Sequence, residues 1–204
     1  MFTRKKFLSE SLIKIKTLAL TGFSLPLLLK KKLYSQSQSQ RGVFDLVAMR
    51  GGTGPVELFE KGIEHIGGMA RFVKKGGTVL VKPNIGWDRT PEYGANTNPE
   101  LVKAIVSSCR KAGASRVYVL DHTCDHWRNA YTNSGIENSV KSAGGEMIPA
   151  NSKSYYREIS VEKGVILKKV LAHRVYLDAD TVINVPVLKH HSSTMITSAM
   201  KNLM

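Results

Sequence analysis

The sequence predicts an α/β domain with a mostly parallel sheet, βαβ crossovers and helices on both faces. Short runs of β-branched and apolar residues alternate with amphipathic segments from Val43 onward. Glycine, proline and asparagine residues stand at the points where these segments change, as expected for helix ends. A helix between consecutive strands of one sheet makes a right-handed crossover, so neighbouring strands are expected to run parallel.

The first strand is expected at Phe44–Met49, where the glycine-rich Gly51–Gly54 turn ends it. A helix follows over about Pro55–Lys75, because its apolar residues recur at helical spacing and proline favours the first helical position. Gly76 and Gly77 end this helix. The apolar run Thr78–Val81 is typical of a strand covered on both faces.

The middle of the chain continues the alternation. Asn98 is a natural N-cap for a helix over Glu100–Lys111, and Pro99 follows it as the first helical residue. A third strand is expected at Val117–Leu120, and a third helix at Ile136–Ala143.

The last part of the domain is less regular. Tyr156–Ala172 alternates loosely and could form a hairpin. Asp180–Leu188 has the pattern of a buried strand, in which Pro186 indicates an edge position or an irregularity. Ser192–Leu203 is expected to begin a helix.

The chain is basic, with a formal net charge of +14, but the charge is unevenly spread. Half of the excess falls in residues 1–40, which hold eight Lys and Arg residues and one Glu. The rest of the excess favours an anionic ligand. No basic stripe interleaved with aromatic residues and no nucleic-acid motif occurs, so nucleic acid is not an expected partner.

The amino-terminal segment has the order of an export signal. Thr3–Leu8 is basic, Thr17–Leu29 is an uncharged stretch of signal-core length, and Ser35–Gln40 is polar. The start resembles the twin-arginine signal, with Lys5 in place of the second arginine. The sequence therefore predicts a signal or anchor with a linker over 1–40 and a single α/β domain over 41–204. The protein is expected to be exported, periplasmic or membrane-anchored facing the periplasm, with membrane contact only through this segment; a disordered basic tail is the alternative.

Two cysteines occur, Cys109 and Cys124. Two thiols cannot hold an iron–sulfur cluster, which usually takes four, so this chain alone is expected to hold none. Cys109 lies near the end of a predicted helix and Cys124 lies past the opposite end of the following strand, a separation of about 20 Å by strand rise. Two free thiols are predicted, with Cys109 buried and Cys124 reactive near the site.

Three predicted strands end in polar clusters, where parallel α/β sheets bind their ligands. The clusters are Lys82-Pro83-Asn84, Asp121-His122 and Lys189-His190-His191. Lysine at such an edge commonly holds a carboxylate or phosphate, although Lys82 could simply extend to solvent. Asp121 could act as a base, bind a metal or cap its loop. We expect Lys82, Asp121 and Lys189 on one edge of one sheet.

The remaining candidates extend this site. Asp121, His122 and His190 are the candidate catalytic residues. His122, His126 and His190 are candidate metal ligands, although a loop histidine is more often solvated and no cofactor is assigned. Thr194 and Lys201 would share one face of the last predicted helix, whose start beside the histidines would favour an anion. The candidate ligand-binding residues are Lys82, Asn84, Asn184, Lys189, Thr194, Lys201 and Asn202, of which Asn84 and Asn184 could equally be structural.

Several of these motifs together resemble a known family. They are Lys82-Pro83-Asn84, Asn96–Val102, Ile183–His190 and the final Thr197 with Lys201-Asn202. In this combination the chain resembles domain of unknown function family 362, clearly over 82–204 and weakly over the first strand. The resemblance implies an exported protein and, often, ferredoxin-like iron–sulfur modules further along the chain. It also implies that this sequence is the amino-terminal part of a longer protein, or a shortened member.

The expected function is binding, with or without transformation, of an anionic small molecule. A redox enzyme that works with an iron–sulfur module or partner protein is one form of this hypothesis. The alternatives are a periplasmic accessory protein that holds an anion or metal without turnover, and a truncated remnant with an incomplete site.

Overall fold

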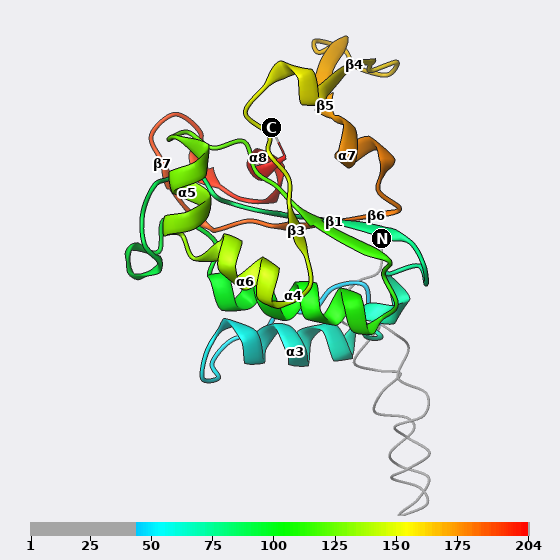
Figure 1. Cartoon of the computed structure of the whole chain (residues 1–204), viewed down its shortest axis with the longest axis vertical. Helices are drawn as coiled ribbons and strands as arrows, with labels where there is room; N and C mark the ends of the chain where they lie inside the picture. The colour runs from blue at the N-terminus through cyan, green and yellow to red at the C-terminus, as the bar shows by residue number, and fades with distance from the viewer. Residues whose placement is uncertain (1–43, 204) are drawn as a thin grey trace, which may run out of the picture. The chain divides into compact units, whose positions relative to one another are not determined.

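The computed structural model describes residues 44–203. Their centre is a four-stranded parallel sheet in the order β3-β2-β1-β6, as expected for an α/β domain (Figure 1). From β1 the chain adds β2 and then β3 on one side, and it later returns to place β6 on the other side of β1. The strands are β1 Thr78–Pro83, β2 Arg116–Val119, β3 Glu146–Met147 and β6 Thr181–Val185.

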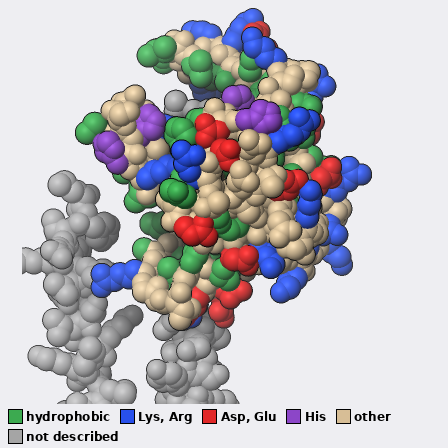
Figure 2. Space-filling view, turned by 60° about the vertical axis from the view of Figure 1, so that its left-hand side comes forward, with side chains coloured by type: hydrophobic (Ala, Val, Ile, Leu, Met, Phe, Trp, Pro, Cys, Tyr) green, Lys and Arg blue, Asp and Glu red, His purple; other side chains and the backbone are tan. Residues whose placement is uncertain are grey.

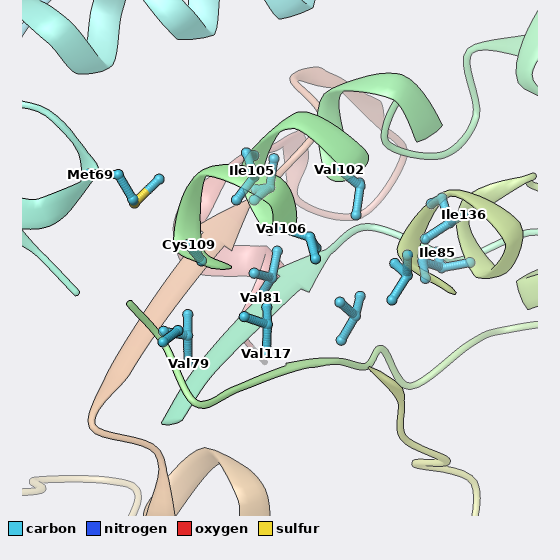
Figure 3. Packing of buried hydrophobic residues seen from close by; sticks show 14 of the residues in the cluster. Met69, Val79, Val81, Ile85, Val102, Ile105, Val106, Cys109, Val117 and Ile136 are labelled. Atoms are coloured by element: carbon cyan, nitrogen blue, oxygen red, sulfur yellow. The ribbon is translucent and has the colours of Figure 1, made fainter. Parts of the chain in front are cut away.

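The larger helices cover one face of the sheet (Figure 1). They are α3 Pro55–His65, α4 Pro99–Lys111 and α6 Ile136–Ser142. Successive strand residues point to opposite faces, so Val79 and Val81 of β1 meet α4 while Leu80 faces the other way. Figure 3 shows Val79, Val81 and Val117 beneath α4. This is the main core of the domain.

The second face has a smaller cover, in which Leu80, Leu120 and Ala150 are buried. The short helix α7 Arg174–Asp178 packs on it, and so does Tyr156 at the start of a hairpin. The hairpin pairs β4 Tyr156–Ser160 with β5 Lys169–His173 in antiparallel register, which confirms the hairpin interpretation of Tyr156–Ala172.

Several predicted elements are confirmed with small shifts. The side chain of Asn98 accepts a hydrogen bond from the backbone N–H of Leu101 at 3.1 Å, so Asn98 is the N-cap of α4 as expected. The strand predicted to reach Leu188 ends at Val185, and Pro186 follows this edge strand. The remaining elements are α5 Trp127–Asn133 and the single turns η1 Met69–Arg71, η2 Pro91–Tyr93 and η3 Lys153–Tyr155.

The first predicted strand is wrong. Phe44–Met49 is not a strand, because no strand within residues 44–203 pairs with it; Val47 and Met49 instead lie beside Gly62 of α3. The first helix is also shorter than expected. It ends at His65 because Gly67 and Gly68 take positive φ values of 97° and 78°, which side chains rarely tolerate.

The helix predicted over Ser192–Leu203 is present only at its end, as the short helix α8 Ala199–Asn202. The first part of the segment forms the turn and second strand of a hairpin, in which β8 Met195–Thr197 pairs with β7 Lys189–His191. Nδ1 of His191 accepts the backbone N–H groups of Ser193 and Thr194, both at 3.2 Å, and so closes the turn. The helical spacing of Thr194, Thr197 and Lys201 is therefore not realised.

The signal or anchor segment and the linker predicted over residues 1–40 lie outside the described residues. Within 44–203, no helix combines the length and apolar character needed to cross a membrane.

Candidate functional site

The topology places a cavity where ligands are expected to bind. The order in which the chain adds strands reverses between β1 and β6: β2 and β3 lie on one side of β1, and β6 lies on the other. Ligands of open parallel sheets bind outside the carboxyl ends of the strands at such a point. A cavity of about 170 Å³ lies there. Figure 2 shows His, acidic and basic side chains gathered on one face of the domain. The cavity is lined by Lys82, Asn84, Gly86, Asp121, His122, Cys124, Pro186, Val187, Thr197, Ser198, Lys201 and Asn202.

Lys82 and Asp121 form an ion pair in the cavity wall. Lys82 is the fifth residue of β1, and Asp121 lies two residues beyond the end of β2. The side chains are only 12% and 6% exposed. The second carboxylate oxygen of Asp121 accepts the backbone N–H of Ile85 at 2.6 Å. Because the charge is paired and hydrogen-bonded, the carboxylate is held in one orientation at the cavity.

Tyr131 of α5 fixes the backbone of Asp121 from behind. Its hydroxyl donates to the carbonyl of Asp121 at 2.8 Å and accepts the N–H of the same residue at 3.1 Å. Burial raises the pKa of Tyr131, so the hydroxyl stays protonated and available as a donor. Tyr131 is not among the site residues predicted from the sequence, because nothing in its local pattern signals contact with a strand end.

Thr97 joins the ends of the two strands that flank the cavity. Its hydroxyl donates to the carbonyl of Val185 and accepts the backbone N–H of Asn84, both at 2.8 Å. The backbone N–H of Thr97 also donates to the carbonyl of Asn84 at 2.8 Å. The side-chain oxygen of Asn84 is buried and finds no hydrogen-bond donor within residues 44–203. Asn84 is therefore an acceptor with unused capacity in the cavity wall.

Asn184 and Asn202 hold α8 against the sheet. The Asn202 amide donates to the side-chain oxygen of Asn184 at 2.7 Å and to the carbonyl of Lys82 at 3.2 Å. The Asn184 amide donates to the carbonyl of Ala199 at 2.9 Å. Asn202 lines the cavity, whereas Asn184 does not line it and instead holds α8 in place. This arrangement fits a structural role for Asn184, one of the two alternatives expected from the sequence.

Within the described part of the chain, two lysines and one carboxylate line the cavity, and a third lysine, Lys189, lies nearby. Lys189 donates to the carbonyl of Ala95, and burial together with the nearby charge of Lys201 lowers the pKa of Lys189. Across residues 44–203, neither Lys189 nor Lys201 has a carboxylate within ion-pair distance. Lys82 and Lys201 are the two lysines of the wall, and Asp121 is the carboxylate. The site therefore carries an excess of positive charge.

Lys82 and Asp121 lie at the carboxyl edge of the sheet, but Lys189 belongs to the separate hairpin β7–β8 beyond β6. Thr194 and His190 do not line the cavity: Thr194 is exposed in the turn of that hairpin, and His190 is exposed on β7. The anion site expected at a helix start near Ser192 is absent from the described chain, because no helix begins there.

The metal candidates are not brought together. Among residues 44–203, no three His, Cys, Asp or Glu side chains lie close enough to hold a metal ion. His126 is exposed at the N-cap position of α5, and His190 lies on β7. His122 lies at the cavity, with its ring 6.4 Å from that of Tyr156.

The two cysteines are free and differ in environment, as predicted. Cys109 is fully buried in the core under α4, and burial raises the pKa of its thiol to about 12. Cys124 is exposed and lines the cavity. An exposed thiol beside a cationic site is the more accessible of the two to reagents.

Fold and site together define a parallel α/β domain with a cationic cavity at the carboxyl edge of its sheet. Residues 79–204 match the model of the family described as domain of unknown function DUF362. The chain belongs to this family.

A relative with a curated description is the thylakoid-associated protein sll1697 of Synechocystis sp., which is 29% identical over 141 residues. The aligned region covers 69% of this chain and 42% of that protein, so the chain spans less than half the length of this relative. No solved structure matches the sequence.

Proposed function

We propose that this domain binds a small anionic molecule in the cavity at the carboxyl edge of its sheet. The observation that carries the proposal is the excess of positive charge at the cavity, where Lys82 and Lys201 line the wall with the carboxylate of Asp121. Lys189 lies near enough for the charge of Lys201 to lower its pKa. Lysines that share a site repel one another, and a bound anion offsets that repulsion. The unused oxygen of Asn84 would accept a hydrogen bond from a hydroxyl, amine or water that accompanies the anion.

The same residues are suited to proton transfer on the bound molecule. The Lys82–Asp121 pair offers an ammonium donor and a carboxylate acceptor side by side, and His122 adds an imidazole at the cavity wall. His190 lies outside the cavity and takes no role in this proposal. Anion binding without turnover, as in an accessory protein, is the competing function; it would use Lys201 and Lys82 but would not depend on His122.

Calorimetric titration of the purified chain with inorganic phosphate and with short carboxylates tests the binding proposal. Lys201→Met should weaken binding about tenfold or more, because a charge-assisted contact contributes about 1.5–3 kcal/mol. Lys111→Met is the matched control, since Lys111 is an exposed lysine at the far end of α4. Equal affinity of wild type and Lys201→Met, or no binding of any anion, would overturn the proposal.

Once a substrate is found, measuring turnover and anion affinity in the same variant separates catalysis from binding. His122→Gln keeps a polar side chain but cannot carry a proton at neutral pH. Loss of turnover with unchanged anion affinity would support proton transfer by His122. Unchanged turnover would support the view that His122 only lines the cavity.

We also propose that the protein is exported and works at or beyond a membrane. The charged, apolar and polar order of residues 1–40 supports export, and the relative from Synechocystis sp. is described as thylakoid-associated. Changing Arg4 and Lys5 to alanine in a tagged protein should retain it in the cytoplasm. Unchanged delivery of this variant would exclude the twin-arginine route.

A redox role would need an iron–sulfur module outside this chain, because two cysteines are too few to hold a cluster. We propose such a module, on a partner or a further segment, as one form of the function. Iron and acid-labile sulfide analysis of the anaerobically purified natural complex tests it. A complex without either would leave anion binding as the function.

A further inference from the structure

A second cavity adjoins the cationic one on the second face of the sheet. It measures about 260 Å³, and it shares Lys82 and His122 with the first cavity. The rest of its wall is almost entirely apolar or aromatic. It includes Tyr156, Ile159, Val170, Ala172, Tyr176 and Leu177. We call this cavity the apolar groove.

The hairpin β4–β5 contributes residues of both its faces to the wall of the apolar groove. Along β5, Val170 and Ala172 are half-buried, while Lys169 and Leu171 are exposed. The antiparallel register places Ile159 of β4 directly opposite Val170, and Ile159 is half-buried as well. Side chains opposite one another in such a pair lie on the same face, so Ile159, Val170 and Ala172 share one face of the hairpin. Tyr156, Leu171 and His173 share the other face, and both sets line the groove.

Two polar residues in the groove wall already use their polar atoms within the protein. The hydroxyl of Tyr156 donates to the carbonyl of Ala150 at 2.8 Å. One ring nitrogen of His173 contacts the carbonyl of Pro149 and the other accepts the N–H of Val175, both at 3.2 Å. These contacts occupy the ring nitrogens of His173 and the hydroxyl proton of Tyr156. The charged groups of the combined site are those at its cationic end.

The sizes of the two cavities also favour a ligand that occupies both of them. Small-molecule sites usually enclose about 300–1,000 Å³, and the cationic cavity alone, at about 170 Å³, is smaller. With the adjoining groove of about 260 Å³, the site reaches that range. A ligand that fills both has its charge at Lys82 and Lys201 and its apolar part against the hairpin.

We infer that the ligand is an amphipathic acid, with a carboxylate or phosphate at one end and an apolar chain or ring at the other. This inference rests on the proposed anion binding and extends it by the class of molecule. The anionic end would lie in the cationic cavity, and the apolar end would pass Lys82 and His122 into the apolar groove.

The test compares anions of equal charge and different length by calorimetric titration of the whole chain. The probes are butanoate and octanoate, with butyl and octyl phosphate as the phosphate pair and neutral 1-octanol as the chain without charge. Each methylene that becomes buried should raise affinity about three- to fourfold, so the eight-carbon acids should bind at least about tenfold tighter than the four-carbon acids. Octanol should bind more weakly than octanoate.

Variants of the groove show where the chain binds. Val170→Thr keeps the shape and β-preference of valine but adds a hydroxyl, and Ala172→Phe fills the groove. Both should remove most of the advantage of the long acids and leave the affinity for butanoate unchanged. Val165→Thr is the matched control, because Val165 is 88% exposed and lies outside the groove.

The outcomes separate this inference from the proposed function. Binding of butanoate and octanoate with equal affinity would refute the amphipathic ligand and leave anion binding intact. A length advantage that survives in both groove variants would also refute it, since the chain would then lie elsewhere. If no anion of either length binds, the proposed function itself fails.

Discussion

Removing the ammonium of Lys82 should destabilise the domain more than removing any lysine of its surface ion pairs. The Lys82→Met variant keeps the length and packing of the side chain but leaves the carboxylate of Asp121 buried without its cation. Of its two hydrogen-bond donors among the described residues, Lys82 and the backbone N–H of Ile85, that carboxylate would keep only the N–H of Ile85. The variant therefore isolates the electrostatic contribution of the pair.

The magnitude follows from the burial of the two groups. Breaking a buried ion pair by removing one partner costs about 3–5 kcal/mol, because an uncompensated charge stays out of water. The side chain of Lys82 keeps 12% of its surface exposed and that of Asp121 keeps 6%, so we expect the lower end, about 3 kcal/mol. For a domain of this size, 1 kcal/mol shifts Tm by about 2–4 °C, which gives a drop of about 6–12 °C.

Thermal unfolding followed by circular dichroism measures this shift, with Lys141→Met as the matched control. Lys141 pairs with Glu137 one helical turn away, and the two side chains are 63% and 29% exposed. Such a surface pair contributes about 0.3–0.5 kcal/mol, so the control should lose about 1–2 °C. The double variant Lys82→Met/Asp121→Asn should be less destabilised than the sum of the single changes. If Lys82→Met loses no more than the control, the pair is solvated and the reasoning is refuted.

Three further outcomes are expected. Tyr131→Phe should lose about 1–3 kcal/mol of unfolding free energy, because it removes the hydrogen-bond partner of two buried backbone groups. The control Tyr93→Phe, at a residue that is 72% exposed, should lose almost none. Equal losses would contradict the role assigned to Tyr131. Burial lowers the pKa of His173 from its ordinary 6.5, so the unfolded chain takes up this proton first. The free energy of unfolding should be level above pH 6.5 and fall as the pH drops from 6.5 through the lowered folded-state pKa. Urea titrations at several pH values should show a smaller fall for His173→Asn than for the wild type. If the free energy falls equally in both proteins, the prediction is refuted. A thiol reagent applied to the native protein should label Cys124 before Cys109, as mass spectrometry of peptides would show; preferential labelling of Cys109 would overturn the packing described for α4.

The sheet and its polar edge could be predicted because local pattern determines them. A short apolar run directly followed by Lys82 or by Asp121 indicates where a buried strand meets solvent, and parallel crossovers bring such ends to one edge. The N-cap at Asn98 was equally readable, since an Asn-Pro pair before an amphipathic run is a local signal.

The carboxyl-terminal hairpin could not be predicted in the same way. Thr194, Thr197 and Lys201 have helical spacing, and nothing local excludes a helix there. The hairpin depends on a turn closed by the ring of His191 and on a positive φ of 61° at Met195, an unusual conformation for a residue with a side chain. Both are local features, but the residue types involved do not single them out, so the sequence pattern alone does not display them.

The partners of the site residues were also beyond prediction, because they are distant in sequence. The Asn202 amide donates to the carbonyl of Lys82, a contact across 120 positions. Tyr131 reaches the backbone of Asp121 from a helix that begins without a side-chain cap and has no strong apolar period. Residue type and strand position identify which groups can serve a ligand, whereas the three-dimensional structure decides which of them meet.

The arrangement of charge that results is unfavourable for the empty domain. Folding brings Lys82 and Lys201 to one cavity from separate segments and places Lys189 near it, and the charge of Lys201 contributes to the lowered pKa of Lys189. One carboxylate cannot neutralise three ammonium groups, so this part of the fold opposes stability. Local conflict of this kind is concentrated at functional sites, where a ligand relieves it. The excess of positive charge, set beside a mostly apolar groove, is the strongest physical reason to propose a function for this domain at the carboxyl edge of its sheet.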